Sequence, residues 1–209
     1  MIEPTEDFFP DAFEDSEAAF RRMLDRICRD MDVDADEVDL VFIRDHAQEL
    51  YLEDAAGHAV SLAAAGTWHE ASGRTQISIS RRHNPSPIDL VGTFAHELAH
   101  HKLLGGGLLY GDEFDNELLT DLTAVFHGFG IFLGNSPRNW ASQNTTWPNS
   151  RVSRPEYLSL PMYAYALAHR LWLRGERKAD WMRFLSYDLR PNVRQGIAFL
   201  PKTGNSAYR

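Results

Sequence analysis

The chain has 209 residues, of which 44% are hydrophobic and 24% charged, and this composition is ordinary for a soluble globular protein that buries a core. A formal net charge of −9 argues against nucleic acid and anionic membranes as partners, because both favour basic surfaces. The single cysteine, Cys28, excludes an intrachain disulfide, and its helical apolar surroundings predict a buried, inert thiol.

The beginning of the chain carries no recognisable targeting signal. Residues 1–7 are acidic and lack the basic and apolar regions of a signal peptide. No apolar run approaches the roughly 20 residues that a membrane-spanning helix needs. We therefore expect a cytoplasmic protein without a membrane segment.

The first part of the chain predicts one helix followed by strands. Residues 1–13 are expected to form a loose lead-in, and apolar residues recur at helical spacing over residues 14–30. Residues 38–43 have the β-branched content and length of a strand, whereas 50–52 and 59–62 are weaker strand candidates.

The middle of the chain predicts a strand and then a series of helices. Residues 75–80 alternate between polar and apolar side chains, which predicts a half-exposed strand that could lie at a sheet edge. A helix follows, since Ser86 is a favourable N-cap, Pro87 suits the first helical position, and the pattern runs to about Leu104. Further helical segments are expected at about 115–132, 161–175 and 179–187.

A long polar stretch separates the last predicted helices from the rest. Residues 134–158 are rich in Asn, Ser, Thr, Pro and Trp, which predicts a loop of the length that is usually functional or disordered. We therefore predict a single α+β domain over residues 1–209, in which residues 159–209 form a helical C-terminal subregion.

The sequence His96-Glu97-Leu98-Ala99-His100 lies within the helix that begins near Ser86. Residues four apart on a helix share one face, so both imidazoles can bind one metal ion. Glu97 follows the first of these histidines and can reach a water bound to that metal. This arrangement is typical of a zinc hydrolase.

A third ligand is needed, because catalytic zinc usually takes three protein ligands and a water. Glu117 and Asp121 lie four apart on the next predicted helix and can face the same side. One carboxylate could bind the metal while the other accepts a hydrogen bond from a ligand histidine. Only Glu117 has an aspartate four residues further on, which favours it over its acidic neighbours Asp112, Glu113 and Asp115.

The two motifs together, His-Glu-x-x-His and Asn-Glu-x-x-Thr-Asp, resemble the active site of the thermolysin-type zinc peptidases, the gluzincins. In that family the second motif reads Asn-Glu-x-x-Ser-Asp. The resemblance covers about residues 75–133. The chain would be a minimal version of the family, because the gap between the motifs is shorter than in thermolysin and no large helical C-terminal domain is present.

The resemblance implies a role for each motif residue. The zinc ligands would be His96, His100 and Glu117. Glu97 would be the general base, and Asp121 would accept a hydrogen bond from His96 without binding the metal. The resemblance also implies a zincin-like fold, in which a small mixed or antiparallel sheet packs on the active-site helix and the strand at 75–80 binds an extended peptide along the sheet edge.

Peptide hydrolysis also needs a hydrogen-bond donor near the developing oxyanion. Tyr165 and His169 lie four apart on the third predicted helix and are candidate catalytic residues, with a plain core position as the alternative for Tyr165. His101 is expected to face away from the metal, because neighbouring helical residues differ by about 100° in direction. His127 is expected to belong to the core.

The sequence therefore predicts a zinc metallopeptidase that acts on a peptide or protein substrate, with Glu97 as general base. Three alternatives stay open. The first is a zinc hydrolase of a non-protein amide. The second is a zincin-fold regulatory or binding protein that holds the metal but does little proteolysis. The third is a structural metal site that only joins helices.

Overall fold

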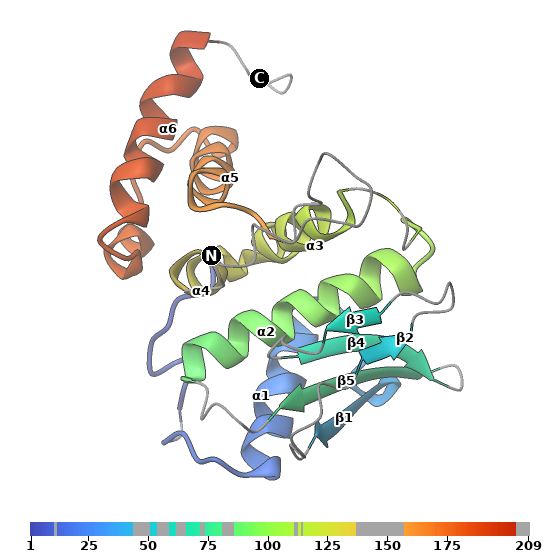
Figure 1. The fold of residues 1–209 in the computed structure, drawn as a ribbon. Coiled ribbons are helices and arrows are strands. Elements are labelled where there is room, and N and C mark those ends of the chain that lie inside the picture. The colour runs from blue at the N-terminus through green and yellow to red at the C-terminus, as the bar shows by residue number, and fades with distance from the viewer. Residues whose placement is uncertain are drawn as a thin grey trace. The chain divides into compact units, whose positions relative to one another are not determined.

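The computed structural model describes residues 1–10, 12–43, 51–53, 59–61, 66–71, 74–80, 86–110, 113, 115–136 and 157–203 (Figure 1). The chain divides into two compact units. We call Phe13–Leu108 the sheet unit, and Met1–Ala12 together with Leu109–Arg209 the helical unit. The single domain predicted over residues 1–209 stays a prediction.

The sheet unit begins with helix α1 (Glu17–Asp30), as the apolar periodicity predicts. The helix starts at Glu17 because the Ser16 hydroxyl accepts a hydrogen bond from the Ala19 N–H at 3.2 Å. Its buried face consists of Phe20, Leu24, Ile27 and Cys28. A 3₁₀ turn at Ala35–Glu37 then leads into the first strand.

Cys28 is fully buried, as predicted, and burial raises the pKa of its thiol to about 12. Because the thiolate is the reactive form, Cys28 should be inert at neutral pH while the fold is intact. We expect a thiol reagent such as DTNB at pH 8 to label Cys28 only as fast as the protein unfolds, and at once in denaturant. Immediate labelling of the native protein, followed by absorbance, would contradict this packing.

The main sheet contains β1 (Val38–Ile43), β4 (Gly66–Ala71) and β5 (Arg74–Ser80), in the order β1-β5-β4. β1 runs parallel to β5, with Val38 opposite Thr75, and β4 runs antiparallel to β5, with Trp68 opposite Ile77. A separate antiparallel pair joins the short strands β2 (Tyr51–Glu53) and β3 (Ala59–Ser61). The chain thus mixes α and β structure, with one small mixed sheet in this unit.

The prediction that residues 75–80 form a half-exposed edge strand is wrong. β5 is the central strand and is hydrogen-bonded on both sides. Its residues Thr75, Ile77, Ser78 and Ile79 are buried, so both faces are covered. Residues 66–71 were not predicted to form a strand, although Ser72-Gly73, which lies outside the described residues, is a dipeptide typical of turns.

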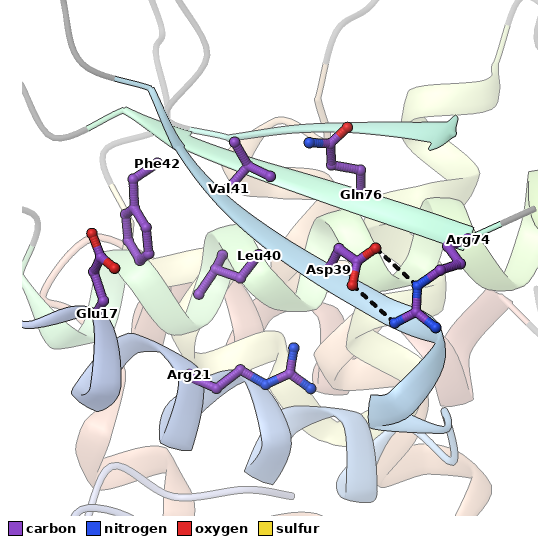
Figure 2. Close-up of a pocket in the computed structure, with 8 residues that line it drawn as sticks. All are labelled: Glu17, Arg21, Asp39, Leu40, Val41, Phe42, Arg74 and Gln76. Carbon is purple, nitrogen blue, oxygen red and sulfur yellow. Dashed lines mark hydrogen bonds and ion pairs between the residues drawn. The ribbon is translucent and has the colours of Figure 1, made fainter. Parts of the chain in front are cut away.

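Polar contacts join α1 and the start of β5 to β1 and the turn before it, and Figure 2 shows the pair between Arg74 and Asp39. The Arg21 guanidinium on α1 donates to the carbonyl oxygens of Val38 and Ala35, each at 2.6 Å. The Arg74 guanidinium donates to both carboxylate oxygens of Asp39, at 2.9 and 2.8 Å, and these bonds hold the pKa of Asp39 below its usual value. The bonds secure the register of β1 and β5 at the end where both strands begin.

Helix α2 (Pro87–His100) runs along the sheet within this unit and contacts α1 and β4 (Figure 1). It starts where predicted, because the Ser86 hydroxyl accepts from the Asp89 N–H at 3.2 Å and Pro87 occupies the first turn. Every residue from Leu90 to His100 is buried. A π-helical turn at His101–Gly105 continues the helix to Gly105, close to the predicted end near Leu104.

The helical unit contains α3 (Asn116–Ala124) and α4 (Gly130–Asn135), joined by a π-helical turn at Val125–Phe129. The sequence predicted one helix here, and Gly128, with φ of +105°, provides the kink that divides it. The lead-in at residues 1–10 is attached to this kink. The Ile2 N–H donates to the Gly128 carbonyl at 3.1 Å, and the buried Phe8 ring packs on Phe132.

The rest of this unit is α5 (Leu160–Leu173), a 3₁₀ turn at Asp180–Phe184, and α6 (Leu189–Thr203). The predicted helical C-terminal part is therefore present, and it includes α6, a helix that was not predicted from the sequence. α5 and α6 pack very closely, since a Cβ added at Gly196 would lie 2.7 Å from the Ala168 Cβ. Of the loop predicted at 134–158, residues 137–156 lie outside the described residues, and Gly134 and Asn135 belong to α4.

Candidate functional site

His96 and His100 occupy one face of α2, one turn apart, as their spacing predicts. Their ring centroids are 4.8 Å apart and the two rings are nearly perpendicular. Both side chains are buried, with exposed fractions of 3% and 8%. Two imidazoles held this close on a rigid helix present nitrogen atoms that one metal ion could share.

Glu97 lies between these histidines in the sequence and is also buried, at 5% exposure. Most of the other buried side chains of α2 are apolar, with Leu90, Val91, Phe94 and Leu98 fully or almost fully inaccessible. The buried hydroxyl of Thr93 donates to the Asp89 carbonyl of its own helix. Packing alone does not require two histidines and a carboxylate among such residues, and a buried carboxylate is costly unless it is paired. The polar cluster on α2 is therefore better explained by function than by folding.

His101 does not belong to this face. Its Nδ1 lies 2.7 Å from the Thr75 hydroxyl on β5, so the ring is hydrogen-bonded to the sheet. This contact confirms that His101 is directed differently from His100, as expected from the helical rotation of about 100° per residue. The bond also ties the π-helical turn after α2 to the central strand.

The acidic candidates lie on α3 in the helical unit. Glu117 is half-buried in the first turn, and Asp121 is fully buried one turn later. The Asp121 Oδ2 atom accepts a hydrogen bond from the Leu158 N–H at 2.8 Å. This bond holds the Asp121 carboxylate in a fixed orientation, which sequence reasoning did not foresee because Leu158 is distant in the chain.

The competing acidic residues have less favourable surroundings. Glu113 uses Oε1 to accept a hydrogen bond from the Tyr110 N–H at 3.1 Å, within its own turn. Asp115 is exposed, and Asp112 lies outside the described residues. Glu113 and Glu117 are both half-buried, and Glu117 is distinguished from Glu113 and Asp115 by Asp121 one turn further along α3.

Tyr165 and His169 are brought together on one face of α5, with ring centroids 6.1 Å apart. Both are half-buried, and the Tyr165 ring also approaches Phe199 of α6 at 6.4 Å. Their common face matches the sequence prediction, whereas their catalytic role stays a prediction. His127 is half-buried in the π-helical turn and does not belong to the fully buried core.

No protein-family model matches the chain, and searches of the curated proteins and of the solved structures found no match.

Proposed function

We propose that the protein is a zinc-dependent metallopeptidase in which His96, His100 and Glu117 bind the metal. The observation that carries this proposal is the buried face of α2, where two imidazoles lie with ring centroids 4.8 Å apart beside a buried carboxylate. Two imidazole nitrogens and one carboxylate are a ligand set that catalytic zinc prefers, with one position left for water. The resemblance to the gluzincin motifs supports the same set and a zincin-like fold.

Each protein group has a distinct task in this mechanism. Bound zinc would lower the pKa of a water towards ~7 and polarise the scissile carbonyl. Glu97 takes the proton of the attacking water and delivers it to the leaving amine. By the gluzincin resemblance, Asp121 would orient His96 by accepting a hydrogen bond from the ring nitrogen that does not bind metal. Tyr165 and His169 are the candidate donors to the oxyanion.

The substrate would bind as an extended strand beside α2. Because β5 is enclosed between β1 and β4, it has no free edge for a peptide. Within the described residues, β4 pairs only with β5 and contacts α2, so its outer edge takes the role that the sequence analysis assigned to residues 75–80. Main-chain hydrogen bonds along β4 would hold a peptide or protein segment near Glu97.

Cobalt substitution tests whether the metal has an exchangeable position. We expect the visible spectrum of the Co²⁺ protein to shift when azide or a small hydroxamate is added, because an open catalytic site accepts an outside ligand. Glu97→Gln should show the same shift, since Glu97 does not bind the metal. A spectrum insensitive to both anions would contradict the open site and indicate a structural metal that only joins helices.

A further inference from the structure

A second candidate site lies in the helical unit, and none of its lining residues takes part in the metal proposal. It is a pocket of about 390 Å³. It lies between residues 177–179, the 3₁₀ turn at Asp180–Phe184, and the first two turns of α6. Its charged lining residues are Arg177, Lys178, Asp180, Arg183, Arg190 and Arg194.

The charge of this pocket is opposite to that of the chain. Five lining residues are cationic and only Asp180 is anionic, whereas the chain as a whole has a net charge of −9. Arg183 has a loose ion pair, with Nη2 3.6 Å from the Glu3 Oε2. In the described part of the chain, no ion pair is found for Arg177, Lys178 or Arg194. Such a concentration of like charge is unfavourable in an empty pocket and is relieved by a bound anion.

The geometry of the pocket is partly fixed in advance. The Arg190 guanidinium donates from Nη2 to the Arg183 and Leu185 carbonyls, at 2.7 and 2.8 Å, so the side chain is held in place. Arg183 stacks on the Phe184 ring at 4.7 Å. Arg190 and Arg194 lie in the first two turns of a helix of 15 residues, whose N-terminal end adds partial positive charge. Ordered cations bind an anion with less entropy loss than mobile ones.

We propose that this pocket binds a small anion that carries phosphate groups. Arginine predominates in the lining, and its planar guanidinium donates two parallel hydrogen bonds to phosphate oxygens. The volume lies within the range of small-molecule sites, roughly 300–1,000 Å³. The proposal does not depend on the metal site, because none of its residues belongs to the zinc or catalytic set.

Calorimetric titration with pyrophosphate at constant ionic strength tests this site. We expect saturable binding to the wild type, about tenfold weaker binding to Arg194→Ala and to Arg177→Ala, and unchanged binding to the control Arg29→Ala on α1. Both pocket side chains are exposed, so the variants should fold, which circular dichroism checks.

Two results would overturn the proposal. The first is the absence of saturable binding to the wild type. The second is binding that is equally strong in Arg194→Ala and Arg29→Ala, because pyrophosphate held by a bound metal would not depend on Arg194. Neither result tests peptide hydrolysis with Glu97 as general base. The anion site can therefore be rejected while the metallopeptidase proposal stands, and the reverse also holds.

Discussion

Glu97→Gln is expected to bind zinc like the wild type and to lose peptide hydrolysis by a factor of about 10² to 10⁴, the usual contribution of a general base. Glutamine matches glutamate in shape but cannot accept a proton at neutral pH. Glu97 is buried beside His96 and His100, so a substitution of equal volume should leave the packing of α2 intact. The substitution should therefore lower the rate of turnover and leave the fold unchanged.

The measurement uses zinc-loaded proteins and a peptide library, with cleavage products and initial rates followed by mass spectrometry. Glu37→Gln, an exposed residue before β1, provides the matched control and should cleave at the wild-type rate. Cleavage by Glu97→Gln at the wild-type rate would remove the catalytic role of Glu97. Absence of cleavage by every zinc-loaded protein, including the wild type, would favour a binding protein with a zincin-like metal site.

His100→Ala is expected to abolish the stabilisation of the fold by zinc. A ligand that binds only the folded state stabilises it in proportion to the logarithm of its concentration, by about 4 kcal/mol at a thousand times Kd. Removal of one imidazole leaves too few protein ligands to hold the ion. The unfolding midpoint in urea should rise with zinc in the wild type and stay constant in His100→Ala.

His101→Ala is the matched control for this experiment. It removes the neighbouring imidazole, which is bonded to Thr75, and should lower stability by about 1 kcal/mol while the response to zinc is retained. If zinc raised the unfolding midpoint of His100→Ala as much as that of His101→Ala, zinc would stabilise the protein through other residues. The two-histidine site would then be rejected.

Local signals in the sequence predicted the elements that carry the site. Ser86 caps α2 as predicted, and the spacing of His96 and His100 places both on one face. These features depend only on residues within one or two turns. The start of β1 at Val38 was predicted for the same reason, since its β-branched run is a local property.

Features that depend on distant residues were missed or wrongly assigned. β5 was predicted as an edge strand because its alternation does not reveal that β1 and β4 flank it. The bond between the Asp121 carboxylate and the Leu158 N–H joins residues that no spacing rule connects. α6 was overlooked, and it packs on α5 through Gly196, a residue that sequence reasoning counts as a weak helix former. Strand neighbours and helix partners are set by tertiary packing.

The metal content of protein purified without added metal, measured by elemental mass spectrometry for the wild type and Glu117→Ala, is the most direct test of the proposed site. We expect about one zinc per chain in the wild type, in line with one catalytic site. Zinc should be lost in Glu117→Ala and retained in the control Glu113→Ala, whose carboxylate is bonded to the Tyr110 N–H. Zinc retained at full affinity in Glu117→Ala would contradict the ligand set, and a wild type that binds no zinc even after reconstitution would contradict the metallopeptidase.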